Sequence, residues 1–221
     1  MKKKFLILTT AIGKGDINTF EKFDNCDYIL ITDRKTSEEI RNMWDIVSPI
    51  NFSTIDRYTN RRNSKIYKVL STILYPEYEY IIWIDSNFKL MVNPQTLIDE
   101  YTYNVDLILF NYPGGILDTC VYDELDRIQK SALDDIKNIN AQRHFYDYVN
   151  MPKNFGLYAM GCFVKKNTPA VKLFEFMWWE QINKFCSRDQ CSVSYCIWKL
   201  QNELKVSTFK SNIFNNKYFT Q

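Results

Sequence analysis

The sequence YIIWIDSNFKL, residues 80–90, begins as an apolar run and then meets an acidic residue. Its bulky and β-branched side chains predict a buried β-strand over residues 80–85, which is followed by Ser86 and Asn87. In an extended backbone Asp85 and Asn87 point to the same side, where their oxygen atoms could face one hard cation. Taken alone, the stretch is better explained by Asp85 beginning a turn and Asn87 tolerating a left-handed backbone.

Apolar runs alternate with helical patterns in the sequence before and after this strand. Further strands are predicted over residues 4–10, 28–33, 50–56, 105–110 and 156–167, and helices over residues 36–44, 63–76, 96–101, 120–150, 169–184 and 188–200. Residues from 205 onward are expected to form an irregular extension. The alternation predicts an α/β domain with a mainly parallel sheet, whose ligand site lies at the carboxyl ends of the strands. Thr9, Thr10, Asp33 and Asp85 lie at such ends.

The composition is typical of one globular domain. The chain has 221 residues, of which 46% are apolar and 24% charged, and this excludes a disordered chain. The net charge of +2 argues against a nucleic-acid binder that works through a strong basic field. Six cysteines without C-x-x-C spacing and a single histidine argue against a structural zinc site, so we expect free thiols in a reducing compartment.

Three lysines and a short apolar run open the chain in the manner of a signal peptide. The run is only about eight residues long, and the segment 13–16 closes it without a small-residue cleavage site. A first strand is therefore the better interpretation. No segment has the length of a membrane span, so we expect a soluble cytoplasmic enzyme or one domain of a larger protein.

A basic segment precedes the strand that ends at Asp85. Its members are Arg57, Arg61, Arg62, Lys65 and Lys68. Arg61 and Lys65 are four residues apart and share one face of a helix. A basic helix face beside a metal site suits phosphate oxygens, whereas on its own such a face is more often solvated.

Two blocks of the sequence resemble the glycosyltransferase A (GT-A) superfamily. RRNSKIYKVLSTILYPEYEYIIWIDSNFKL (61–90) is similar to a group with a basic helix, a P-x-Y-x-Y turn and a W-I-D-G-N strand end. MPKNFGLYAMGCFVKKN (151–167) and FMWWEQINKFCSRDQCSVSYCIWK (176–199) follow the same group's order of motifs. This group includes plant pollen- and mucilage-related enzymes and algal-virus capsid glycosyltransferases.

The resemblance implies a fold and a reaction. It implies one GT-A-like (Rossmann-like) domain over residues 1–221, with a nucleotide-sugar-binding half at 1–110 and an acceptor-binding half at 111–221. The implied reaction is the metal-assisted transfer of a sugar from a nucleotide-sugar, with a UDP-sugar expected, to a hydroxyl of a glycan or glycoprotein.

The resemblance also implies residue roles. Asp85 and Asn87 stand where the family's D-x-D-type motif holds Mn²⁺ or Mg²⁺ and the donor diphosphate, although neutral Asn87 is a weaker ligand than aspartate. Asp189, in S-R-D-Q, matches the acidic residue that faces the acceptor or the sugar. It could act as a general base on an acceptor hydroxyl or only hydrogen-bond to sugar hydroxyls, and Ser187 is expected to cap the helix that follows. The positions expected to contact the donor are Thr9, Thr10, Asp33, Arg62, Lys65, Asp85 and Ser86.

Two alternatives to a glycosyltransferase remain open. One is a non-catalytic module that binds nucleotides or glycans, in which Asn87 marks a degenerate site. The other is a nucleotidyltransferase, which shares the α/β sheet and the use of a metal ion at a diphosphate. Nucleotidyltransferases usually carry a glycine-rich phosphate loop near the first strand, and residues 9–16 are a poor version of one.

Overall fold

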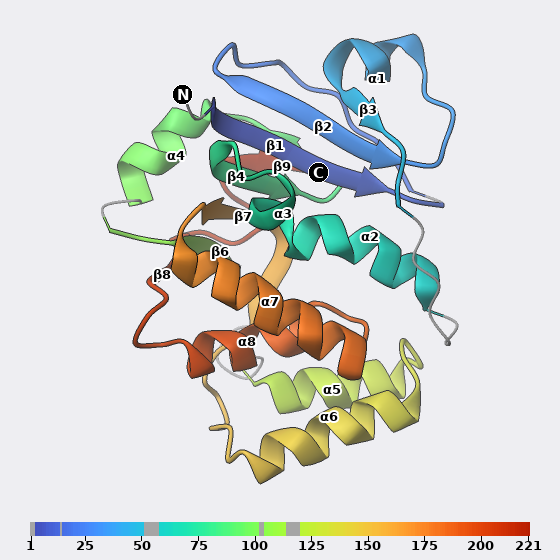
Figure 1. Cartoon of the computed structure of the whole chain (residues 1–221), viewed down its shortest axis with the longest axis vertical. Helices are drawn as coiled ribbons and strands as arrows, with labels where there is room; N and C mark the ends of the chain where they lie inside the picture. Colours follow the sequence, from blue (N-terminus) through green and yellow to red (C-terminus); the bar gives the residue numbers. More distant parts are fainter. Residues whose placement is uncertain (1–2, 14, 51–57, 102–103, 114–119) are drawn as a thin grey trace.

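The computed structural model describes residues 3–13, 15–50, 58–101, 104–113 and 120–221. Within these residues the core of the fold is a seven-stranded sheet in the order β3-β2-β1-β4-β7-β6-β8 (Figure 1). The strands of this sheet are β1 Lys3–Ala11, β2 Cys26–Thr32, β3 Asp45–Val47, β4 Tyr78–Ile84, β6 Leu107–Asn111, β7 Tyr158–Lys166 and β8 Val206–Thr208. β7 runs antiparallel to both of its neighbours, and the other pairings are parallel. The predicted α/β fold with a mainly parallel sheet is therefore confirmed.

Helices and loops cover both faces of the sheet. The helices are α1 Glu38–Met43, α2 Thr59–Val69, α3 Ser71–Leu74, α4 Pro94–Tyr101, α5 Val121–Lys130, α6 Ile136–Tyr148, α7 Pro169–Lys184 and α8 Gln190–Lys199. One hydrophobic core joins the sheet to α2, α7 and α8, with α5 and α6 packed beyond α8 (Figure 1). The other core joins the opposite face to α1, α4 and the C-terminal segment. No helix in the described residues is both long and apolar enough to cross a bilayer.

The alternation of side chains along β4 places the first acidic residue of the site. Ile81 and Trp83 belong to the core on the side of α2 and α7, whereas Ile82 and Ile84 belong to the opposite core. Since successive side chains of a strand point to opposite faces, the next residue on the side of α2 is Asp85. The strand thus presents its terminal carboxylate to α2.

The predicted helix over residues 63–76 is divided into α2 and α3. It begins earlier than expected, at Thr59, and breaks at Leu70. Near the break, the carbonyl oxygens of Lys68 and Val69 each accept a hydrogen bond from Lys165 Nζ at 3.0 Å. A buried ammonium group on β7 thus holds the last turn of α2 against the sheet.

The C-terminal region differs from the expected irregular extension, because it contributes two short strands. β8 extends the main sheet by pairing parallel with β6, and β9 Phe219–Thr220 pairs with β5 Lys89–Leu90. The predicted strand 50–56 falls, apart from its first residue, outside the described residues. The predicted helical stretch 120–150 forms α5 and α6, and the six cysteines are unpaired as expected.

Candidate functional site

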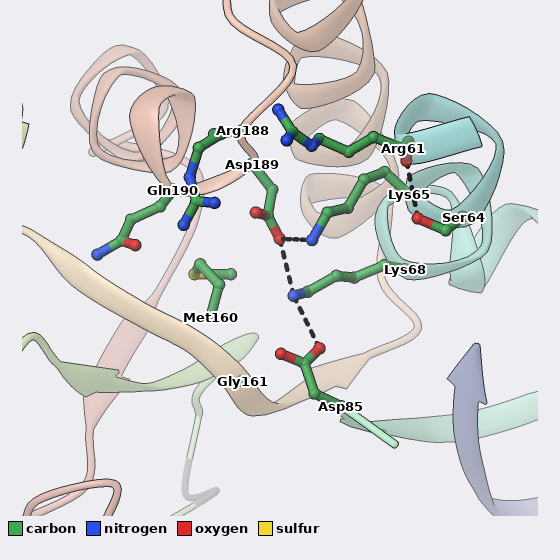
Figure 2. Close-up of a pocket in the computed structure, with 10 residues that line it drawn as sticks. All are labelled: Arg61, Ser64, Lys65, Lys68, Asp85, Met160, Gly161, Arg188, Asp189 and Gln190. Carbon is green, nitrogen blue, oxygen red and sulfur yellow. Dashed lines mark hydrogen bonds and ion pairs between the residues drawn. The ribbon is translucent and has the colours of Figure 1, made fainter. Parts of the chain in front are cut away.

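A pocket of about 370 Å³ opens where α2, the end of β4, β7 and the start of α8 meet (Figure 2). Its lining residues are Arg61, Ser64, Lys65, Lys68, Asp85, Met160, Gly161, Arg188, Asp189 and Gln190. Four of them are cationic and two are carboxylates, so the formal charge of the lining is 4 − 2 = +2. A pocket with this balance attracts anions.

Two lysines of α2 contact Asp189, and one of them, Lys68, also contacts Asp85 (Figure 2). Lys68 Nζ lies 2.7 Å from Asp189 Oδ2 and 3.2 Å from Asp85 Oδ1, and its side chain is only 1% exposed. Lys65 Nζ lies 2.9 Å from the same Asp189 oxygen, with 21% of its side chain exposed. Lys65 is therefore the lysine that a ligand can reach, and Lys68 is the internal link.

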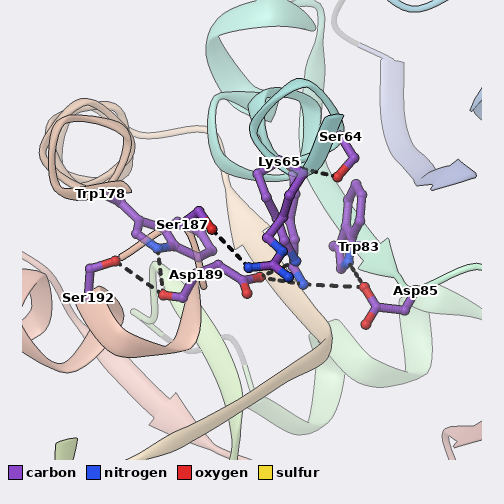
Figure 3. A network of polar contacts seen from close by, with 10 residues as sticks. Ser64, Lys65, Trp83, Asp85, Trp178, Ser187, Asp189 and Ser192 are labelled. Atoms are coloured by element: carbon purple, nitrogen blue, oxygen red, sulfur yellow. Dashed lines mark hydrogen bonds and ion pairs between the residues drawn. The ribbon is translucent and has the colours of Figure 1, made fainter. Parts of the chain in front are cut away.

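Asp85 is held by its neighbours as well as by Lys68. Trp83 Nε1 donates to Asp85 Oδ1 at 2.8 Å (Figure 3), and the Asp85 N–H donates to the carbonyl oxygen of Gly161 at 2.7 Å. The Asp85 carbonyl accepts from Phe88 N at 2.8 Å, which closes a turn directly after the strand. The backbone therefore turns at Asp85, as the stretch taken alone indicates, and the extended exit that would point Asp85 and Asn87 to the same side is wrong.

Asp189 stands at the N-cap position of α8, and its backbone is fixed from two sides. Trp178 Nε1 donates to the Asp189 carbonyl at 3.0 Å, and Ser192 Oγ donates to it at 3.2 Å (Figure 3). The prediction that Ser187 caps this helix is wrong. Both the backbone N–H and the hydroxyl of Ser187 donate instead to Asp134 Oδ2, at 2.8 and 2.5 Å. This contact anchors the loop that carries Asp189.

The close charges set the protonation of the site. Burial by itself raises the pKa of the Asp189 carboxyl, but the ammonium groups of Lys65 and Lys68 outweigh it and hold that pKa well below its usual range. Burial lowers the pKa of Lys65. At Lys68 burial acts in the same direction, but Asp189 and Asp85 overcome it and the pKa is raised. Asp189 is therefore ionised and weakly basic in this arrangement.

Two buried nitrogen atoms of the pocket lack a hydrogen-bond partner in the described part of the chain. They are Arg188 Nε and Gln190 Nε2, which flank Asp189 in the sequence. Buried donors are normally paired, and an unpaired one costs about 1–3 kcal/mol. Because N–H groups donate, the ligand that would satisfy them carries acceptor oxygens.

The Mn²⁺ or Mg²⁺ expected at Asp85 and Asn87 does not fit this donor set. One oxygen of Asp85 already accepts from Trp83 and Lys68, and Asn87 is neutral and exposed. Among the described residues, no three Asp, Glu, His or Cys side chains form a group that could hold a metal ion. The surrounding charge is positive and the unpaired atoms are donors, so the pocket matches an anion.

Several of the predicted donor-contacting residues lie in a second pocket of about 240 Å³. It is lined by Thr10, Ala11, Ile12, Ser64, Lys65, Trp83, Asp85, Ser86 and Asn87. Because it shares Ser64, Lys65 and Asp85 with the first pocket, the two adjoin. Asp33 lies at the end of β2, where its Oδ1 accepts from Gly13 N at 3.0 Å.

Asp33 lines neither pocket, and the same holds for two further predicted residues, Thr9 and Arg62. Thr9 is fully buried, and its hydroxyl has no hydrogen-bond partner in the described residues. Arg62 is buried and donates to the carbonyl oxygens of Ile182 and Phe185, at 3.1 Å each, at the end of α7. Arg62 does not line either pocket, and Arg57 lies outside the described residues.

The sequence prediction assigned no individual role to Lys68, Arg188 or Gln190. Lys68 had a signal, since Arg61, Lys65 and Lys68 recur at four- and three-residue spacing and form one stripe along α2. Arg188 and Gln190 are the immediate neighbours of Asp189. Their N–H groups can be recognised as donors to a ligand only once the structure places the loop before α8 over the sheet.

A third pocket, of about 250 Å³, shares Asp85, Met160, Gly161 and Gln190 with the first. Its other lining residues are Asn87, Phe88, Tyr112, Pro113, Ala159, Ile213, Phe214 and Gln221. Aromatic side chains next to polar groups provide surfaces of the kind that bind sugar rings. Three adjoining pockets thus meet at Asp85.

The TOD1/MUCI70 glycosyltransferase-like domain family matches residues 22–221 of the chain. A curated relative, the probable hexosyltransferase MUCI70 of Arabidopsis thaliana, is 26% identical over 166 residues. The match covers 69% of this chain, and the chain spans 27% of the relative's length.

Solved glycosyltransferase structures share the fold of the chain. The mannosyltransferase Ktr4p from S. cerevisiae superposes with a TM-score of 0.51 and 10% identity, covering 100% of this chain and 70% of that one. Mouse xyloside xylosyltransferase 1 has a TM-score of 0.51 and 10% identity, covering 95% and 85%. Core-mannan synthase A from Aspergillus fumigatus, in a Mn/GDP form, has a TM-score of 0.51 and 8% identity, covering 99% and 74%. At these identities the likeness shows the fold, which is that of GT-A glycosyltransferases.

Proposed function

Since the chain belongs to the TOD1/MUCI70 glycosyltransferase-like family, we propose that it transfers a sugar from a nucleotide-sugar to a hydroxyl group of a glycan or glycoprotein. We propose a UDP-sugar as the donor. The observation that carries the proposal is the meeting of Lys65, Lys68, Asp85 and Asp189 in one cationic pocket at the carboxyl end of β4. In open α/β sheets, ligands bind at this edge.

The three pockets around Asp85 provide a place for each part of the reaction. The nucleoside occupies the pocket at the end of β1, where Thr10 and Ser86 lie. The diphosphate occupies the cationic pocket and meets Lys65 and Arg188. The acceptor approaches through the pocket that contains Tyr112. The division into a donor half and an acceptor half stays a prediction, and the cationic pocket draws residues from both halves.

The transfer exchanges one bond to the anomeric carbon for another. The acceptor oxygen forms a bond to the anomeric carbon of the sugar, the bond from that carbon to the phosphate oxygen breaks, and the nucleoside diphosphate leaves with the electron pair. The hydroxyl proton passes to a departing phosphate oxygen or to water. Cationic side chains that face the developing phosphate charge stabilise this transition state.

We assign Asp189 to hydrogen bonds with sugar hydroxyls rather than to proton abstraction. An effective general base has a pKa near the working pH. The two lysines hold the pKa of Asp189 far below that range. Of the two roles open from the sequence, the structure favours hydrogen bonding. The Mn²⁺ or Mg²⁺ that the resemblance implied has no part in this proposal, because the donor set suits an anion.

The proposal is tested by offering the protein UDP-, GDP- and CMP-sugars and measuring the melting temperature and the nucleotide released. We expect a UDP-sugar to raise the melting temperature and to be turned over. Asp85→Ala should remove the turnover, while Asp99→Ala, a matched change at an exposed residue of α4, should retain it. Failure of every nucleotide-sugar to stabilise the protein would refute the proposal. Binding without turnover would instead support the non-catalytic module.

A further inference from the structure

Lys68 occupies an unusual position for a lysine. Its ammonium group is buried between two carboxylates from distant parts of the chain, one at the end of β4 and one at the start of α8. The same nitrogen lies 5.3 Å from the ring centre of Trp83 and 5.8 Å from that of Phe163. A buried charge is costly unless it is paired, and these contacts hold Lys68 in the charged form between Asp85 and Asp189.

This is the geometry of a cation that links two acidic ligands. A divalent ion placed at the same point would have Asp85 and Asp189 as ligands, but the site already holds one positive charge there. With Lys65 beside it, the two ammonium groups balance the two carboxylates. Arg188 adds further positive charge, whereas Arg61 is paired with Asp134 at 3.5 Å. This positive field would repel a second cation and attract a diphosphate.

We propose that Lys68 takes the place of a divalent metal ion between Asp85 and Asp189, and that the chain binds a nucleoside diphosphate without such an ion. The nucleotide part rests on the proposed function, while the part about Lys68 stands on the geometry alone. Lys65 contacts the phosphate oxygens directly, because it is the more exposed lysine. The unpaired donors Arg188 Nε and Gln190 Nε2 complete the anion site.

The part about Lys68 is tested by titrating the protein with MnCl₂ alone and following binding by calorimetry and by the loss of the free Mn²⁺ electron paramagnetic resonance signal. The wild-type protein should not bind Mn²⁺ in the pocket. Lys68→Met should gain Mn²⁺ binding, because it removes the charge between Asp85 and Asp189 and leaves only Lys65 paired with Asp189. Lys184→Met makes the same change at an exposed lysine of α7 and should gain nothing.

The nucleotide part is tested with UDP and wild-type protein, which does not depend on whether Lys68→Met folds. The dissociation constant for UDP should change by less than about threefold between excess EDTA and excess MnCl₂. Tight Mn²⁺ binding by the wild-type protein, or UDP binding that EDTA abolishes and Mn²⁺ restores, would overturn the inference. If UDP binds under neither condition, the nucleotide part and the proposed function fail, while the Mn²⁺ titrations still decide the role of Lys68.

Discussion

The buried pair of Lys165 on β7 and Glu175 on α7 fixes the end of the helix that carries Lys65 and Lys68, and replacing Lys165 with methionine tests its contribution. Both side chains of the pair are fully buried. Lys165 Nζ contacts Glu175 Oε1 and donates to the carbonyl oxygens of Lys68 and Val69. The substitution removes these interactions and leaves the Glu175 carboxylate without its counter-charge.

Breaking a buried ion pair from one side costs about 3–5 kcal/mol. Glu175 keeps hydrogen bonds from Thr72 N at 3.0 Å, from the Thr72 hydroxyl at 2.8 Å and from the Ser71 hydroxyl at 3.4 Å. These bonds still stabilise the carboxylate, so we expect a loss of about 3 kcal/mol, at the lower end of the range. The double variant Lys165→Met/Glu175→Gln removes the unpaired charge and should recover about half of the loss.

The free energy of unfolding is measured by urea denaturation followed by tryptophan fluorescence. Lys166→Met is a matched control, since Lys166 is the next residue of β7 and its ammonium group lies 5.8 Å from the ring centre of Tyr80. Lys166→Met should lower the free energy of unfolding by less than about 1 kcal/mol. A cost of Lys165→Met below about 1 kcal/mol, or a double variant no more stable than the single one, would refute the reasoning.

Two further predictions concern the pocket. Lys65→Met should weaken UDP binding, measured by calorimetry, by about 10- to 150-fold, because a hydrogen bond to a charged group contributes about 1.5–3 kcal/mol. An unchanged affinity for UDP would show that Lys65 does not belong to the anion site. Asp189→Asn should lower the free energy of unfolding near neutral pH. This difference from wild type should shrink as the pH falls below about 4. A carboxyl with a depressed folded-state pKa stabilises the fold above its unfolded pKa and loses this contribution as acid protonates it. A deficit in the urea midpoint that is constant from neutral pH to pH 3 would contradict the ionised state assigned to Asp189.

The sequence was informative where a periodic pattern determines the structure. The apolar run before Asp85 predicts a buried strand, and the period of two places Asp85 on the same face as Trp83. The helical spacing of its apolar residues predicts a helix over residues 169–184 with the bounds of α7, and in the structure Thr168 caps this helix.

Residue roles on α2 were harder to predict, because they depend on direction around the helix. Each residue advances by about 100°. Arg61, Lys65 and Lys68 therefore share one stripe, and Arg62 lies about a quarter turn away, where it meets the end of α7. The spacing of the stripe was readable in the sequence, but which stripe faces the strand ends depends on packing against β1 and α7.

Contacts made by short segments could not be predicted from local patterns. β8 is only three residues long and gains its stability from pairing with β6, and β9 likewise depends on β5. Lys68 is separated from Asp189 by more than a hundred positions, so their ion pair exists only once the chain has folded. Tertiary pairing decided these features, and local propensity did not.

The most direct test of the proposed function is a crystal structure of the protein with UDP bound. The structure should show the diphosphate in the cationic pocket, with a phosphate oxygen within hydrogen-bond distance of Lys65 Nζ and the uridine toward Thr10 and Ser86. Lys68 should remain between Asp85 and Asp189. A diphosphate bound elsewhere, or no UDP bound at saturating concentration, would contradict the proposal that this pocket binds the nucleotide-sugar.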